Sequence, residues 1–146
     1  MPVAGFSFSK ISLEKIKAPS GQVNIKNNIA ITNVEKDTFP FGKAKDDAVK
    51  FTFAFKSEYD PGVAIMEFEG TVLYMSDTKE AKLLIDDWSK KKQIKPEISV
   101  QILNTALTKC NIIAINMSQE LGLPSPIPLP KIDVDKKSNS DKNYIG

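Results

Sequence analysis

Apolar and polar residues alternate along the first half of the chain in the way that β-strands require. Phe6 and Phe8 share one parity, while Ile11 and Leu13 take the opposite one. A slip of this kind indicates a β-bulge near Ser9-Lys10, because one inserted residue turns all the following side chains to the other face. We therefore predict a bulged first strand here.

Three further strands are predicted between residues 23 and 75. Isoleucines and valine of a single parity give a second strand of about ten residues over 23–31. Three phenylalanines alternate with polar residues over 50–56, and a fourth strand over 63–75 contains Gly70, a predicted bend or bulge. Short turns between most of these segments indicate an antiparallel sheet with one polar face.

Helical spacing replaces alternation after residue 76. Asp77 is placed as an N-cap with Glu80 at the third helical position, a variant of the capping box. The helix that follows has a single apolar stripe at i, i+3, i+4 and i+7, and it should end at the lysine run 90–92. The stripe consists of Ala81, Leu84, Ile85 and Trp88.

A longer helix is predicted over 96–121, with Pro96 in its first turn and Gly122 as a left-handed C-cap. Its main apolar stripe is predicted to be Leu103, Ala106, Leu107, Cys110, Ile113, Ala114, Met117 and Leu121. A helix that is apolar on more than one side needs more cover than one sheet face gives. We therefore predict a homodimer or homotetramer whose interface includes further apolar residues of this helix, namely Ile98, Ile102, Ile112 and Ile115.

Proline occupies every second position from 124 to 130. Missing amide donors exclude a helix or a central strand, so an extended segment is expected, with its leucines and isoleucine free to dock on the body of the protein. Residues 133–146 are polar and predict a disordered tail. The chain is thus interpreted as one domain over 1–132, which includes the proline-rich segment 123–132.

The composition of the chain excludes several classes of partner and indicates a cellular compartment. Among 146 residues there are 20 lysines and 18 acids, with no arginine and no histidine, and the net charge is +2. This small charge predicts no nucleic-acid partner, and polar residues within 98–121 argue against membrane insertion. With a single cysteine and no signal peptide in its first residues, the chain is expected in the cytoplasm.

The side chains that carry chemistry do not form a catalytic pattern. Glu67 and Glu69 share a strand face but are interpreted as solvated, and Cys110 lies in an apolar stripe without a histidine to activate it. Phosphate-binding glycine loops are absent from the sequence. We predict that the chain is not an enzyme and uses no cofactor and no metal; a small-molecule pocket between sheet and helices stays an open alternative.

The order of four strands, a short helix, a long helix and an extended proline-containing segment resembles the SecB family of export chaperones, over about residues 6–132. The opening 8–16 resembles the family's bulged first strand, and 96–121 followed by 123–132 resembles its interface helix and the stretch after it. The resemblance implies an α+β fold, a four-stranded antiparallel sheet with both helices packed on one face. It also implies dimers or tetramers, and ATP-independent holding of unfolded polypeptide in long apolar grooves.

By position, the resemblance makes five residues candidates for polypeptide binding, each with an ordinary packing role as its alternative: Phe39, Phe41, Trp88, Ile127 and Leu129. One feature departs from the family, whose bacterial members engage the export motor through an acidic patch on the sheet. Here lysines interrupt the strands, so motor binding is not expected. The alternative function is a non-catalytic adaptor that docks one specific partner.

Overall fold

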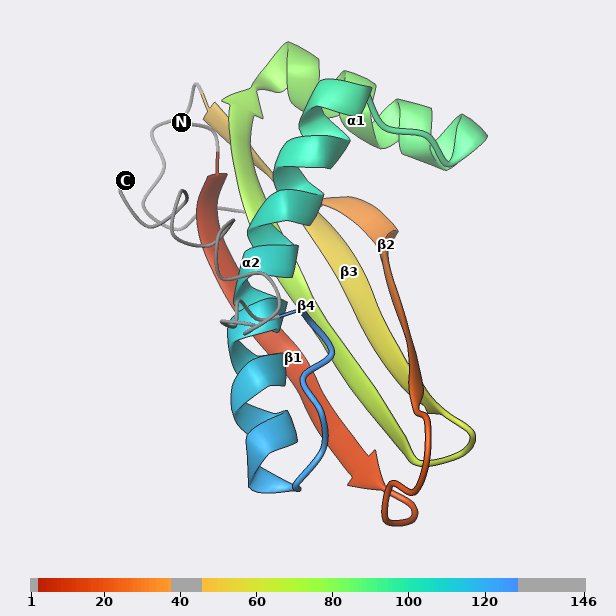
Figure 1. Ribbon diagram of the computed structural model, residues 1–146. Helices are drawn as coiled ribbons and strands as arrows, with labels where there is room; N and C mark the ends of the chain where they lie inside the picture. Colours follow the sequence, from red (N-terminus) through yellow and green to blue (C-terminus); the bar gives the residue numbers. More distant parts are fainter. Residues whose placement is uncertain (1–2, 38–45, 129–146) are drawn as a thin grey trace, which may run out of the picture.

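The computed structural model describes residues 3–37 and 46–128 of the chain, and these form a four-stranded sheet covered on one face by two helices (Figure 1). All neighbouring strands are antiparallel and the sheet order is β1-β4-β3-β2. The elements are β1 (Val3–Lys15), β2 (Asn24–Asp37), β3 (Asp46–Asp60), β4 (Ala64–Asp77), α1 (Thr78–Lys91) and α2 (Pro96–Glu120). The predicted α+β fold class is confirmed.

Both edge strands carry a bulge. The register of β1 against β4 shifts between Phe8 and Lys10, which confirms the bulge that the slipped alternation predicted. Two further shifts were not predicted, one in β1 between Val3 and Gly5 and one in β2 between Ile31 and Asn33. Phe8 pairs with Gly70, Gly70 with Phe53, and Phe53 with Ile31, so the shifts after Phe8 and after Ile31 lie at one level of the sheet.

Gly70 itself is not bulged, because β4 keeps a continuous register with β3 across it; the bulge at this level lies in β1, directly opposite the glycine. The glycine is needed for close approach instead. A Cβ atom added there would clash with the carbonyl oxygen of Ser7 and lie 2.9 Å from the ring of Phe53. The absence of a side chain at this position admits the Phe53 ring into the centre of the sheet face.

The apolar face of the two central strands forms the core. Phe51, Phe53 and Phe55 of β3 are at most 2% exposed, and Met66 and Phe68 of β4 are fully buried beside them. The opposite face is polar and carries ion pairs, among them Lys10–Glu67 at 3.0 Å. The alternation of the sequence therefore separates a dry face from a wet one, as predicted.

Helix α1 begins and packs as its sequence predicts. The Asp77 carboxylate accepts a hydrogen bond of 2.7 Å from the Glu80 amide, and Ala81 and Leu84 are buried against the sheet. Ile85 and Trp88 continue this stripe and are half-buried. The helix ends within the lysine run, with Lys92 as its C-cap.

Helix α2 confirms the predicted stripe in part, because Ala106, Cys110 and Ala114 are buried while Leu107, Ile113 and Met117 are half-buried against the core. Every fourth residue is buried, and four of the six are small: Ile98, Ile102, Ala106, Cys110, Ala114 and Ser118. Small side chains let a helix backbone approach the sheet, so the larger Leu103 and Leu107 lie half-buried on its flank. Ile98 and Ile102, which we assigned to an interface between copies, are therefore covered within the chain itself.

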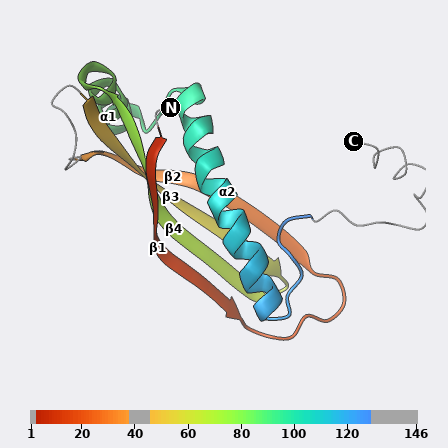
Figure 2. The ribbon, with the colours of Figure 1, turned by 90° about the vertical axis from the view of Figure 1, so that its left-hand side faces the viewer.

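The helix lies along the sheet and ends as predicted (Figure 2). Gly122 adopts φ +64°, its amide donates to the Gln119 carbonyl, and the Leu123 amide donates to the Ser118 carbonyl at 2.8 Å. This is a Schellman motif. Within the described residues α2 is the one helix long and apolar enough to cross a membrane, with a mean hydropathy of 1.3 in its most apolar window, but a helix packed in a protein core meets the same criterion.

The close approach at Gly70 gives a stability prediction. Gly70→Ala should lower the free energy of unfolding by about 1–3 kcal/mol, because the new methyl group displaces either the Phe53 ring or the β1 backbone. The matched control is Gly5→Ala, where the new Cβ would lie 3.4 Å from Leu73. Urea denaturation followed by Trp88 fluorescence measures both; equal midpoints for the two variants would contradict the packing described.

The buried row of α2 predicts the reactivity of its thiol. Cys110 is fully buried, and burial raises the pKa of the thiol to about 12. The native protein at neutral pH should not react with Ellman's reagent, while the urea-unfolded chain should titrate one thiol. Rapid reaction of the native protein would show that α2 does not pack as described.

Candidate functional site

The helices bury the centre of the sheet face but leave its β2 side half-covered. Phe53 and Phe55 of β3 are buried, whereas their partners on β2, Ile31 and Ile29, keep part of their surface exposed. Both isoleucines also pack against the main core. Apolar surface that is anchored in the core and still accessible is a candidate for binding.

Half-buried apolar side chains that pack against the core occur on β1 and α2, and also on β2, α1, the connection after it and the segment after α2. We call the members outside β1 and α2 the apolar rim: Ile29, Ile31, Ile85, Trp88, Ile94 and Ile127. All six contact the same buried core. The rim thus brings two of the predicted binding residues, Trp88 and Ile127, to one face of the sheet.

Trp88 has an unsatisfied donor. Its Nε1 atom is buried and has no hydrogen-bond partner among the described residues, although part of the residue is exposed. The ammonium group of Lys92 lies 5.2 Å from the ring centroid, within the range of a cation–π contact. Leaving a buried donor unpaired costs about 1–3 kcal/mol, and an arriving carbonyl oxygen would reach Nε1 only after the side chains that cover it move.

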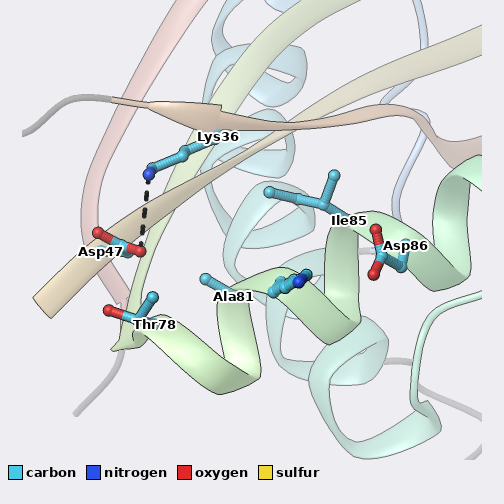
Figure 3. Close-up of a pocket in the computed structure, with 7 residues that line it drawn as sticks. Lys36, Asp47, Thr78, Ala81, Ile85 and Asp86 are labelled. Carbon is cyan, nitrogen blue, oxygen red and sulfur yellow. Dashed lines mark ion pairs between the residues drawn. The ribbon is translucent and has the colours of Figure 1, made fainter.

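A hollow of about 200 Å³ lies between α1 and the ends of β2 and β3 (Figure 3). Ala81 and Ile85 point from the helix toward the strands, and Lys36 and Asp47 close one side with an ion pair of 3.8 Å. The volume is below the range of about 300–1,000 Å³ that small-molecule sites occupy. The hollow suits one apolar side chain better than a cofactor.

Three of the predicted binding residues, Phe39, Phe41 and Leu129, lie outside the described residues. The first two belong to the connection 38–45, which joins the strand ends that border the hollow. Of the predicted interface residues of α2, Ile112 is 55% exposed and Ile115 is half-buried.

The segment after α2 turns back and runs beside the helix over the sheet (Figure 1). We call residues 123–128 the strap. The Tyr59 hydroxyl donates to the Pro124 carbonyl at 2.7 Å, and the Asn27 amide donates to the Pro126 carbonyl at 2.8 Å. Leu123 is only 6% exposed. The strap is docked, as expected for its leucine and isoleucine.

Sequence reasoning missed the donors that hold the strap, although a signal was present. Asn27 interrupts the apolar parity of β2, and Ser57 continues the phenylalanine parity of β3. The Ser57 hydroxyl, fully buried, donates to the Asn27 side-chain oxygen at 2.6 Å. A polar residue at a core position needs a partner, and this requirement could have indicated a docked segment.

Comparisons with known proteins give a likeness of structure and no match of sequence. No family model matches the sequence, and the search of curated proteins gives no match. Among solved structures, a SecB-like chaperone of Mycobacterium tuberculosis, in complex with a peptide from the HigA1 antitoxin, aligns over 90% of this chain and 88% of its own, with a TM-score of 0.49 and 14% identity. A likeness of this degree does not establish membership of a family, and the function proposed for this chain rests on its own side chains.

The strap contact predicts a dependence of stability on pH. Burial raises the pKa of Tyr59 to about 12, above the value near 10 of an unfolded tyrosine. The unfolded chain therefore releases this proton first, and stability present below about pH 10 is lost as the pH rises toward about 12. Urea midpoints measured across this range should fall less steeply for Tyr59→Phe than for the wild type; identical slopes would contradict the burial of Tyr59 beneath the strap.

Proposed function

We propose that this chain binds non-native polypeptide without catalysis and without ATP, through extended apolar segments that lie on the apolar rim. The observation that carries the proposal is the rim itself, a set of apolar side chains anchored in the core beside an incompletely covered strand. Burial of apolar surface contributes about 25 cal/mol per Å², so several partial contacts give useful affinity with little sequence selectivity.

The polar chemistry of the rim also suits a polypeptide. An unfolded chain offers a carbonyl oxygen at every residue, and the unpaired Nε1 of Trp88 can donate to one of them once the side chains that cover it move. The ammonium group of Lys92, 5.2 Å from the ring centroid, is a second donor beside this site. Apolar side chains of the client would enter the hollow that Ala81 and Ile85 line.

The titratable groups favour binding over catalysis. No cluster of three histidine, cysteine, aspartate or glutamate side chains that could hold a metal ion occurs in 3–37 and 46–128. Burial raises the pKa of Cys110, which makes a thiolate nucleophile unfavourable. Lys10 and Lys56 are each paired with a glutamate on the polar sheet face, where the pKa of both lysines is raised by that hydrogen bond.

We also propose that a second copy covers the outer face of α2. Val100 and Ile112 are 56% and 55% exposed there, and Ile115 lies beside them with part of its surface accessible. Exposed aliphatic side chains on an otherwise packed helix are typical of an interface between subunits. Action in the cytoplasm, consistent with a single buried thiol, belongs to the same proposal.

The proposal is tested by mixing the protein with a denatured model enzyme diluted from guanidinium and recording turbidity, with light-scattering mass measured in parallel. The wild type should suppress aggregation at about one oligomer per client. Failure to suppress aggregation at a severalfold excess would contradict the function and leave an adaptor for one partner as the alternative.

Trp88→Leu tests the place of binding. Leucine keeps the apolar contact with the core but removes the donor and most of the ring, so suppression should require several-fold more protein. The control is Leu83→Ala, because Leu83 lies on the same helix, is 46% exposed and is not part of the rim. Both melting temperatures are measured first. Full activity of a folded Trp88→Leu protein would show that binding takes place elsewhere.

A further inference from the structure

The strap presents only acceptors at the positions where it is held. Pro124 and Pro126 have no amide hydrogen, and their carbonyls receive the two bonds from Tyr59 and Asn27. These carbonyls are two residues apart, and the chain bends at Pro126 and Ile127. Ser125, which lies between these two prolines, makes its hydrogen bonds within the strap, between its hydroxyl and the backbone of Ile127.

The sheet side of this contact is preorganised. We call it the strap seat and define it by Val23, Ile25, Asn27, Ser57 and Tyr59. Ser57 donates to the side-chain oxygen of Asn27, which turns the amide nitrogen of Asn27 toward the strap. Tyr59 is 1% exposed, so its hydroxyl is fixed by packing as well as by its acceptor.

Two apolar anchors complete the contact at a spacing of four residues. Leu123 packs with Tyr59 and Val63 in a second small core, which Val23 and Ile25 border. Ile127 packs against the main core and is also a member of the apolar rim. The strap seat and the rim therefore meet at Ile127 on one face of the sheet.

In the part of the chain that the structure describes, no polar group of the strap seat forms a hydrogen bond with a side chain of the strap, so the polar contacts do not select particular residues. Both donors bind backbone carbonyls, and the anchors need only aliphatic side chains. Another extended chain with the same backbone geometry can make the same contacts. A proline-rich chain fits best, because it brings no amide hydrogens that would be buried without partners.

We propose that the strap is a built-in occupant of a binding site for extended, proline-rich polypeptide segments, and that a client segment with aliphatic residues four positions apart binds by displacing it. This inference rests on the proposed function and extends its surface from the apolar rim onto the strap seat. The measured affinity then equals the intrinsic affinity multiplied by the fraction of molecules whose strap is released.

The test uses the full chain and a fluorescein-labelled synthetic peptide with the sequence of residues 123–128, followed by fluorescence anisotropy. Ile127→Ser removes an anchor of the strap and leaves the seat intact, so it should bind the peptide at least about fivefold more tightly than the wild type. The matched control is Leu83→Ser on the exposed side of α1, which should bind like the wild type.

A double-mutant cycle then asks whether strap and peptide share a donor. Tyr59→Phe removes one hydrogen bond from each, so in the wild-type background the two losses should nearly cancel. With the strap already loosened by Ile127→Ser, the same change should weaken peptide binding about fivefold, the equivalent of one hydrogen bond. Equal effects in both backgrounds would overturn the proposal.

A second probe, reduced and carboxymethylated α-lactalbumin, separates this inference from the proposed function. If the wild type binds this unfolded protein and Ile127→Ser binds neither probe more tightly, the function stands and strap displacement is wrong. If only the peptide binds, and only to the loosened variant, strap displacement stands and general polypeptide binding is wrong. A concentration-dependent doubling of mass in Ile127→Ser, relative to the wild type at the same concentration, would mean that the strap exchanges between copies, which also overturns displacement by a client.

Discussion

Four strands of 13 to 15 residues present more apolar surface on one face than the two helices of this chain can cover. Strands of this length run for about 45–50 Å, and α2, with 25 residues, runs for about 37 Å and is about 10 Å wide, roughly the width of two strands. The central strands β3 and β4 are therefore buried. The apolar residues of the edge strands, such as Phe6 and Ile29, stay half-covered.

The row of small residues on α2 further reduces the area of the sheet face that this helix covers. Ala106, Cys110 and Ala114 bring the helix close to the sheet, and a close helix spreads less over the neighbouring strands. The apolar surface that the helices leave uncovered beside β2 falls into two parts. Residues 123–128 dock over one end through Tyr59 and Asn27, while the apolar rim around Trp88 keeps part of its surface accessible. We interpret both as parts of one surface for extended polypeptide.

Local patterns in the sequence predicted what depends on near neighbours: the bulge between Phe8 and Lys10, the Asp77 cap and the Gly122 turn. Features set by distant segments were missed. The predicted stripe of α2 contained Ala106, Cys110 and Ala114 but omitted Ile98, Ile102 and Ser118, which the sheet also covers. The role of Gly70 depends on Ser7 and Phe53, and that of Asn27 on a carbonyl 99 residues later. No local window contains such information.

The central claim is that non-native polypeptide binds on the helix-covered face beside β2. Methyl NMR of a sample labelled at the isoleucine δ1 positions, titrated with an unfolded client, tests it most directly. We predict shifts or broadening at Ile29, Ile31, Ile85 and Ile94, with Ile65 on the polar sheet face and Ile112 on the outer face of α2 unchanged. Perturbation of Ile65 or Ile112 with an unaltered rim would contradict the account.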